Sequence, residues 1–437
     1  MYIRLIIIAI IVTFVFNFQV SAANQPAVKT IFSNGLVLIV KPEPKASTVA
    51  IEIFIRMNVS GEDKATQGLG HLFAGSILGG TKSRSPGKVA RLFSEVGGSF
   101  HAVWQWDYLE IYGVTVPEMC NEALALLADS VRKPAFYPEI VEYSRSVVLK
   151  QAKAFESEPF NATYAELRKS LYPAGPYRHA FIGDPQAIGR VSREQLEAFH
   201  RLCVAPNDIV ISIAGKVSFE KVSEQVHKLF SNMPFVQRSE GAQKWDSPVE
   251  GKFVVKTVGP ATYLMLGFPT AGMASPDYPA LAVANVMLGG NKSSMLFRRL
   301  REELGIGYQV GSFYPSLRGP SHIVAFVGMD SGRATQQVID TAKDAILQQV
   351  ARLKEGLFTD DDLERAKRYL IGTYAVKHER VRDRAFYLGW YEIMGLGYQY
   401  DTEYASKIRA VTRDDICRVS ERYLGVPIAF SSGSASS

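Results

Sequence analysis

Residues 68–83 read GLGHLFAGSILGGTKS, an apolar run at helical spacing that ends in two glycines and is followed by a Lys-Ser pair. The same ending recurs far along the chain, where Leu288-Gly289-Gly290 is followed by Lys292-Ser293. Residues 188–196 and 408–416 also match in character, and each places a Ser or Thr cap before a helix. This internal similarity indicates two related halves that arose by duplication.

The boundary between the halves is predicted from a change in composition. Around residues 232–250, Pro, Gly, Ser and charged residues replace the periodic apolar ones. We therefore expect one domain over residues 24–236 and a second over residues 251–437, joined by a linker at 237–250. A chain of 437 residues is long enough to form two hydrophobic cores.

Each half mixes strand and helix patterns. Residues 35–40 and 48–55 are rich in β-branched residues and predict two strands, and Pro138 can open a helix at its first position. A single buried helix face is predicted by the spacing of Cys120, Ala123, Leu124, Leu127 and Val131. A comparable stripe consists of Val338, Ala342, Ala345, Ile346 and Leu353, with Gly356 as the C-cap. The predicted class is α+β: two homologous α/β-sandwich halves, each a mainly antiparallel sheet covered by helices on one face.

The segment around His71 resembles the zinc helix of the insulinase/pitrilysin family, the inverzincin metallopeptidases, whose signature is HxxEH followed closely by Gly-Thr. His71 matches the first ligand, but Ala74 replaces the general-base Glu and Gly75 replaces the second ligand. Gln151 stands where the resemblance places the third ligand, a Glu on a later helix. The family is built from repeated α+β units, so the two halves are expected to form one side of a clamshell.

These replacements argue against a zinc site in this chain. Catalytic zinc needs three protein ligands, an open position for water and a carboxylate to take the proton of that water. Neither Ala74 nor Gly75 can serve, and an amide is a poor substitute for a carboxylate. We expect no cofactor bound by this chain, zinc in a partner subunit, and His71 satisfied by a backbone or side-chain contact. The alternative is residual zinc binding through His71 and distant ligands.

Two later motifs are better preserved. Residues 97–102, followed by Asp107-Tyr108, look like the strand that pairs with the substrate backbone in active family members, with His101 at a place usually held by Asn. Residues 293–308 strongly resemble the Arg/Tyr segment of the family, and Arg301 and Tyr308 have its usual spacing of seven positions.

The resemblance implies a catalytic role for Arg301 and Tyr308. Hydrolysis by a zinc-bound water develops negative charge on the scissile carbonyl oxygen, which a guanidinium and a phenol can stabilise. Without the resemblance, the simpler interpretation would be an exposed helical arginine and a half-buried strand tyrosine.

Other features of the sequence concern the compartment of the protein and the kinds of partner that it can bind. Residues 1–23 read as a secretory signal, with Arg4, an apolar run and a small-residue cleavage site, so we expect export, with the periplasm as the compartment. An uncleaved anchor is the alternative. The three cysteines are scattered without a CxxC pair, which indicates neither a disulfide scaffold nor a thiolate site. The net charge is +6, and the Lys and Arg residues are interleaved with acidic residues rather than clustered, so no nucleic-acid partner is expected.

The main hypothesis is therefore a non-zinc subunit of an exported zinc metalloendopeptidase, similar to the non-catalytic subunits of mitochondrial processing peptidase and bacterial two-subunit relatives. Its partner would be a homologous subunit that carries HxxEH, and Arg301 and Tyr308 would hold the peptide substrate. The alternative is a non-enzymatic pseudopeptidase that acts as a scaffold or peptide-binding module, with a homodimer as the other assembly.

Overall fold

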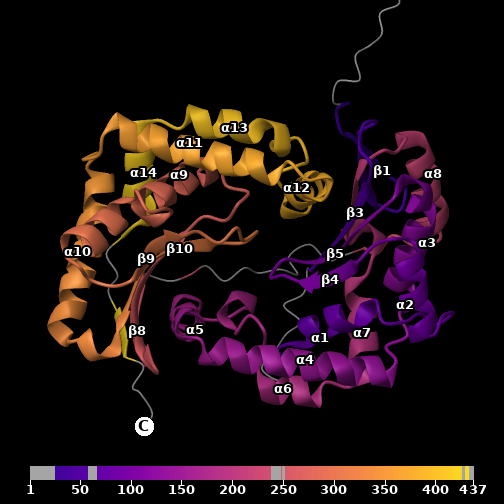
Figure 1. Cartoon of the computed structure of the whole chain (residues 1–437), viewed down its shortest axis with the longest axis horizontal. Helices are drawn as coiled ribbons and strands as arrows, with labels where there is room; N and C mark the ends of the chain where they lie inside the picture. The colour runs from indigo at the N-terminus through magenta and orange to yellow at the C-terminus, as the bar shows by residue number, and fades with distance from the viewer. Residues whose placement is uncertain (1–24, 58–65, 238–247, 249–250, 426–428, 433–437) are drawn as a thin grey trace, which may run out of the picture.

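The computed structural model describes residues 25–57, 66–237, 248, 251–425 and 429–432 (Figure 1). The segment predicted as a signal, 1–23, and all of the predicted linker except residues 237 and 248 lie outside the described residues. The helices and strands fall into two sheet-centred halves that face each other (Figure 1).

The first sheet has six strands within the described residues, in the order β1-β2-β6-β3-β5-β4. The β2–β6 pair is parallel and the other pairs are antiparallel. The strands are β1 (Val28–Ile31), β2 (Val37–Pro42), β3 (Val49–Arg56), β4 (Phe100–Trp104), β5 (Tyr108–Thr115) and β6 (Ile209–Gly215). The helices of this half are α1 (Leu69–Ile77), α2 (Pro86–Glu95), α3 (Cys120–Arg132), α4 (Pro138–Ser157), α5 (Pro159–Leu171), α6 (Pro185–Arg190), α7 (Arg193–Cys203) and α8 (Phe219–Phe230), with short 3₁₀ turns at Pro117–Met119, Pro176–Arg178 and Pro206–Asp208.

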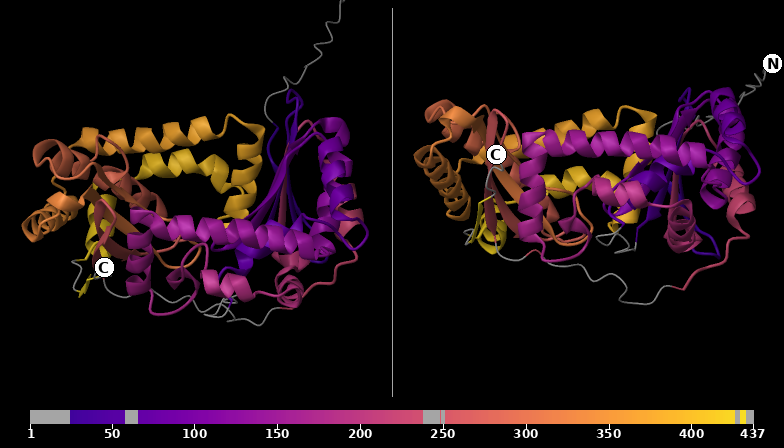
Figure 2. Two further views of the ribbon diagram at one scale, coloured as in Figure 1. Left: turned by 60° about the horizontal axis from the view of Figure 1, so that its bottom comes forward. Right: turned by 90° about the horizontal axis from the view of Figure 1, so that it is seen from below.

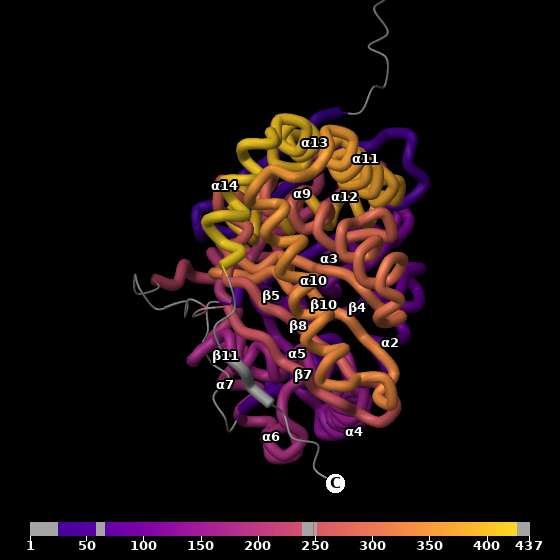
Figure 3. The backbone as a smooth tube through the Cα atoms, turned by 90° about the vertical axis from the view of Figure 1, so that its left-hand side faces the viewer, coloured from indigo at the N-terminus to yellow at the C-terminus, as the bar shows by residue number. Residues whose placement is uncertain are grey.

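The second sheet has five strands within the described residues, in the order β11-β7-β8-β10-β9, and only β11–β7 is parallel. Its strands are β7 (Lys252–Val258), β8 (Ala261–Thr270), β9 (Gln309–Phe313), β10 (Ser321–Asp330) and β11 (Ala429–Ser432). Its helices are α9 (Tyr278–Gly289), α10 (Gln336–Lys354), α11 (Asp360–Lys377), α12 (Val381–Met394), α13 (Tyr400–Ala410) and α14 (Arg413–Tyr423), with a π-helix at Phe297–Glu303 and a 3₁₀ turn at Ser331–Arg333. In Figure 3, α10 lies in front of the strands of this sheet.

The repeat seen in the sequence has a structural counterpart. Two strands, two helical segments and two more strands follow one another as β2, β3, α1, α2, β4, β5 and again as β7, β8, α9, the π-helix, β9, β10. The two Leu-Gly-Gly segments lie at the ends of α1 and α9. In the second copy the glycine is required by packing, since a Cβ at Gly289 would lie 2.3 Å from the backbone nitrogen of Ser312.

The predicted α+β class and several predicted elements are confirmed. The stripe that begins at Cys120 is buried along α3, and Pro138 opens α4. Ser192 and Thr412 each form a capping box, for α7 and α14. The side chains of Ala342 and Ile346 are among the buried residues of α10.

The structure adds an exchange of helices between the halves. α12 belongs to the second half by sequence but packs on β3 and β6 of the first sheet, whereas α5 belongs to the first half and packs on β7 and β8. Figures 1 and 2 show α4 and α5 running from the first half toward the second sheet. Each sheet is therefore covered by its own helices on one face and by a helix of the other half on the opposite face.

The buried side chains of the first sheet explain this arrangement. Along β3, Ile51, Ile53 and Ile55 belong to a core shared with α1 and α3, whereas the intervening Phe54 belongs to the core of the second half. Successive strand residues point to opposite faces. Both faces of β3 are thus buried, and the contact between the halves is part of the hydrophobic core.

Candidate functional site

His71 lies on α1, where a zinc ligand would be expected. Its Nε2–H donates to the carbonyl oxygen of Phe181 at 2.7 Å, and its ring meets the Phe181 ring edge-on with centroids 4.9 Å apart. Burial lowers the pKa of the imidazole to about 4, so the ring is neutral at physiological pH. The prediction that a backbone or side-chain contact satisfies this histidine is confirmed, and the contact is with a backbone carbonyl.

The other positions of the zinc signature do not fit a metal. Ala74 is buried and has no donor atom, and a Cβ at Gly75 would lie 3.2 Å from the Ser144 side chain of α4. Ser144 Oγ instead donates to the Gly75 carbonyl oxygen at 2.8 Å, while Gln151 lies on the exposed side of α4. In the described part of the chain no group of three His, Cys, Asp or Glu side chains could hold a metal ion. The residues present therefore do not fit zinc at this position.

Arg301 and Tyr308 are brought together at an exposed edge of the second sheet. Arg301 lies on the π-helix that precedes β9, and its Nη1–H donates to the carbonyl oxygen of Gly307 at 3.0 Å. Tyr308 is the next residue; its backbone N–H donates to the Gly328 carbonyl oxygen at 2.9 Å, and 47% of the residue is exposed. The guanidinium is thus held beside the residue that carries the phenol, and both side chains reach solvent.

The π-helix itself is unusual, because such turns are rare and often occur at functional sites. Its register places Leu300 in the core and leaves Arg301 outside. The backbone N–H of Leu304 donates to the Arg299 carbonyl oxygen at 3.1 Å, five residues back. The turn that contains Arg301 is therefore one residue wider than an α-helical turn.

Tyr263 is a neighbour of this pair that the sequence did not indicate. It lies on β8, and its hydroxyl donates to Gln309 Oε1 at 2.5 Å. Burial and then the nearby Tyr308 hydroxyl raise the pKa of Tyr263, so this phenol stays protonated. A strand tyrosine 45 positions from Tyr308 has no local sequence signal, because only strand pairing brings the two together.

The segment predicted to pair with a substrate backbone forms β4, the edge strand of the first sheet. Among the described strands, β4 pairs only with β5, so its other edge offers unpaired backbone groups. His101 is exposed on this strand, and its ring lies 5.1 Å from that of Tyr112. β9 occupies the same edge position in the second sheet. His71, on α1, lies in the first half, whereas Arg301 and Tyr308 lie beside β9 in the second half.

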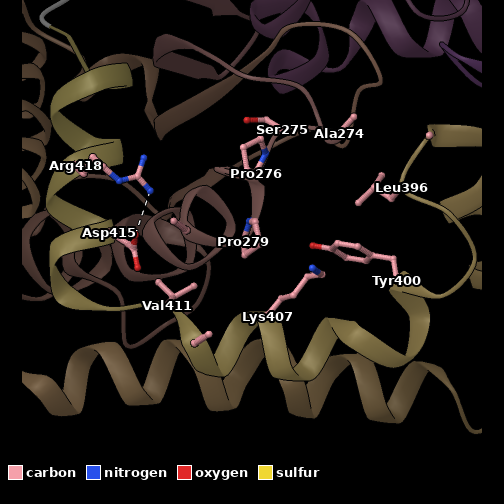
Figure 4. A pocket seen from close by; sticks show the side chains of 13 residues that line it. Ala274, Ser275, Pro276, Pro279, Leu396, Tyr400, Lys407, Val411, Asp415 and Arg418 are labelled. Atoms are coloured by element: carbon pink, nitrogen blue, oxygen red, sulfur yellow. Dashed lines mark hydrogen bonds and ion pairs between the residues drawn. The ribbon is translucent and has the colours of Figure 1, made fainter.

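A separate cavity of about 500 Å³ lies between the start of α9 and the α13–α14 segment (Figure 4). Lys407 and Tyr400 line one side, and the ion pair between Asp415 and Arg418, 3.1 Å apart, lines the other. None of the predicted site residues lies in it. The sequence patterns predict no binding role for this region.

The chain is similar to known peptidases over most of its length. A family model described as "Insulinase (Peptidase family M16)" matches residues 37–183, and one described as "Peptidase M16 inactive domain" matches residues 190–370. Similar curated proteins include the "Uncharacterized zinc protease YmxG" of Bacillus subtilis, 24% identical over 88% of this chain and 92% of that protein. An "Uncharacterized zinc protease" of Rickettsia bellii is 25% identical, with 82% and 85% covered.

Two solved structures share the fold. One is a protease from Helicobacter pylori, with a TM-score of 0.83 and 20% identity over 92% of this chain and 97% of that one. The other is a peptidase M16 inactive domain from Pseudomonas fluorescens, with a TM-score of 0.81 and 21% identity over 92% and 96%.

Among the described residues, no helix is both long and apolar enough to cross a bilayer.

Proposed function

Because this chain belongs to the insulinase (M16) family of peptidases, we propose that it is the non-zinc subunit of an exported zinc metalloendopeptidase. The chain would pair with a homologous subunit that carries an intact HxxEH helix. The partner would supply the zinc, the water and the general base, and this chain would supply Arg301 and Tyr308 to the peptide substrate.

The observation that carries the proposal is the contrast between two positions. At the zinc helix, the one remaining ligand residue is bonded to a backbone carbonyl and its neighbours have no donor atoms. At the edge of the second sheet, by contrast, Arg301 and Tyr308 are adjacent and exposed. Exposure alone is common for arginine and tyrosine, so the proposed role of the pair rests on its accessibility together with the resemblance of residues 293–308 to the Arg/Tyr segment of the family.

The chemistry of the pair suits a developing oxyanion. Arginine stays charged and donates through a rigid fork, and a phenol donates one O–H. Both can point at a scissile carbonyl oxygen as charge builds on it during attack by water. Neither group needs to gain or lose a proton for this role.

The first experiment measures peptide hydrolysis by this chain alone, by the candidate HxxEH partner alone and by their mixture, with zinc determined on each sample. We expect activity only in the mixture and zinc only with the partner. If the partner alone cleaves as fast as the mixture, the subunit role is wrong. That outcome would favour the second candidate, a pseudopeptidase that binds peptides without cleaving them, which the loss of the zinc site also supports.

Substitutions then test the pair. In the mixed complex, Arg301→Ala or Tyr308→Phe should lower kcat on the order of a hundredfold, since each removes one donor to the oxyanion. Arg299→Ala is the matched control, because Arg299 lies on the same π-helix but pairs with Glu303 at 2.8 Å. Assembly of all three variants is checked by size-exclusion chromatography. Variants of Arg301 and Tyr308 that assemble and cleave normally would remove the proposed role.

Export belongs to the same proposal and rests on residues 1–23. Fractionation of cells that produce the full chain, together with the N-terminal sequence of the mature protein, tests it. Recovery from the cytoplasm with an intact N-terminus would contradict export.

A further inference from the structure

A second cavity, of about 310 Å³, lies where the two halves meet. We call it the aromatic pocket. It lies between α5, the turn that joins β4 to β5, and the end of β9. Its walls are mainly aromatic: Trp106, Phe155, Phe160, Tyr164, Phe181 and Phe313. Pockets of this kind bind ligands when a small number of polar groups converge on an apolar lining.

The aromatic pocket contains one buried cation, Arg168. Only 3% of this residue is exposed. Its guanidinium carbon lies 4.5 Å from the centroid of the Trp106 ring and 5.2 Å from that of Tyr164, so two walls of the pocket hold it by cation–π contact. The side chain therefore has a fixed position at the pocket wall.

The hydrogen-bonding capacity of Arg168 is largely unused. Its Nη2–H donates to the carbonyl oxygen of His179, and this is the one hydrogen bond of its side chain within the described residues. Its Nε is buried without a partner. No carboxylate of the described residues pairs with it, and burial lowers the pKa of its guanidinium. A buried charge in this state is costly unless a partner arrives.

The missing partner defines the ligand. A carboxylate matches the fork of an arginine and would compensate the charge. The aromatic walls favour an apolar group directly beside that carboxylate. The volume suits one or two amino-acid residues, because it is at the low end of the range for small-molecule pockets. A cationic ligand is disfavoured by Arg168, and a neutral apolar ligand would leave the guanidinium unpaired.

We propose that the aromatic pocket binds a carboxylate that carries an adjacent aromatic ring, with Arg168 paired to the carboxylate and the ring against Trp106, Phe160 and Phe181. Two sources share this chemistry. One is the C-terminal residue of a peptide that ends in an aromatic side chain, and the other is a free aromatic acid.

The position of β9 connects the pocket with a peptide source. Phe313 lies at the end of β9 and lines the pocket, whereas Tyr308 directly precedes the start of the same edge strand. A peptide paired along this edge would extend roughly 3.3 Å per residue. Its end could therefore reach the pocket. The binding itself does not rest on the peptidase role, because this chain alone is expected to bind.

Isothermal titration of the full chain without its signal, in the absence of any partner, tests the inference. N-acetyl-L-phenylalanine is compared with N-acetyl-L-phenylalaninamide, which has the same shape but no charge. We expect the acid to bind at least about tenfold more tightly, since only the acid compensates Arg168. Equal affinities, or no binding of either up to about 10 mM, would overturn the inference.

Variants locate the effect. Arg168→Met should bring the affinity for the acid down to that for the amide, and Arg168→Lys should keep part of the difference. Lys169→Met is the matched control, since Lys169 is the next residue on α5 and its side chain is 52% exposed. If Arg168→Met does not fold, Ala165→Leu, which retains the arginine but fills the pocket, should abolish binding. Unchanged binding in Ala165→Leu would place the ligand elsewhere and overturn the inference.

A final pair of ligands separates the two sources. If Ala-Ala-Phe binds at least about tenfold more tightly than N-acetyl-phenylalanine, the site recognises the end of a peptide chain. Affinities within a factor of about two would assign it to a free aromatic acid. Both results support the carboxylate site, and neither depends on peptide cleavage by the mixed complex.

Discussion

Two glycines, Gly305 and Gly307, shape the backbone between the end of the π-helix and Tyr308. Gly305 and Gly307 have φ angles of +64° and +79°, a region that favours glycine. They differ in their surroundings. A Cβ at Gly305 would meet open space, whereas a Cβ at Gly307 would lie 2.3 Å from the Val327 side chain. The carbonyl oxygen of Gly307 also accepts the hydrogen bond from Arg301.

This difference gives a prediction at the residue scale. Gly307→Ala should lower the free energy of unfolding by about 2 to 4 kcal/mol, because backbone strain and overpacking add. Gly305→Ala, the control, should cost about 1 to 2 kcal/mol from backbone strain alone. Urea unfolding followed by circular dichroism measures both. Equal costs would show that the Val327 contact is relieved without loss.

His322 is a second residue whose surroundings predict a measurable effect. It is fully buried on β10, with Nε2 2.8 Å from the Tyr164 hydroxyl and Nδ1 2.7 Å from the Tyr172 hydroxyl, both on or just after α5. Burial, followed by the charge of Arg168, lowers the pKa of His322 to about 3. The neutral ring can donate from one nitrogen and accept at the other, which satisfies both tyrosines.

The sign of the pH dependence follows from this lowered pKa. The unfolded chain takes up a proton near pH 6.5 and the folded chain does not, so the stabilisation is complete above pH 6.5 and is lost as the pH falls toward 3. Between pH 7 and 5 the loss is about 2 kcal/mol. In His322→Gln, which keeps a donor and an acceptor, unfolding should lack this component. A parallel pH dependence in the two proteins would contradict the assignment.

At the scale of elements, α12 is held to the first sheet by charge as well as by apolar packing. Arg382 of α12 forms ion pairs with Glu110, at 2.5 Å, and Glu52, at 3.2 Å. Its guanidinium also lies 3.9 Å from the centroid of the Tyr112 ring. Burial first, and then the charge of Glu110, raise the pKa of Glu52 well above its ordinary value. Glu110, whose carboxylate lies closer to the guanidinium, is the main partner of the arginine.

Removal of Arg382 should leave two buried carboxyl groups without their cation. We expect Arg382→Met to destabilise the protein by about 3 kcal/mol at pH 7, the lower end for a broken buried pair, because a third of the arginine side chain is exposed. The triple variant Glu52→Gln, Glu110→Gln, Arg382→Met should recover most of this loss.

Thermal unfolding measures the effect of these substitutions on the stability of the protein. Arg380→Met is the control, since Arg380 is exposed before the start of α12 and should change stability by less than about 0.5 kcal/mol. A triple variant no more stable than Arg382→Met would mean that the arginine acts through packing rather than charge.

At the scale of the whole molecule, the exchange of α5 and α12 makes the halves interdependent. Without α12, the face of the first sheet that carries Phe54 and Val210 would be exposed. Without α5, the second sheet would expose Met265 and Val324. Contiguous apolar faces of this kind lead to aggregation or to assembly.

This predicts the behaviour of separated halves. Residues 24–236 and 251–437, produced alone, should aggregate or fail to show cooperative unfolding. Produced together, they should form a stable complex, because each supplies the helix that covers the sheet of the other. Size-exclusion chromatography and thermal unfolding of the three samples measure this. A single half that is monomeric and unfolds cooperatively would contradict the interdependence.

The sequence determined a large part of this fold. Local spacing sets the α3 stripe and the capping boxes, and the Leu-Gly-Gly repeat marks equivalent helix ends in the two halves. The membership of the insulinase family follows from motifs that can be read directly. The loss of donor atoms at positions 74 and 75 is also a matter of residue type. The domain boundaries and the roles of Arg301 and Tyr308 stay predictions.

Other features were decided only by the tertiary structure. The run Val49-Ala50-Ile51-Glu52-Ile53-Phe54-Ile55 is almost continuously apolar, which indicates a strand buried on both faces. It cannot indicate that α12, more than 300 residues away, covers the second face. Tyr263 beside Tyr308, Phe181 beside His71, and the aromatic pocket around Arg168 depend on the same long-range packing. Periodicity reports which side of an element is buried, whereas the partner is selected by shape and charge complementarity between segments far apart in the chain.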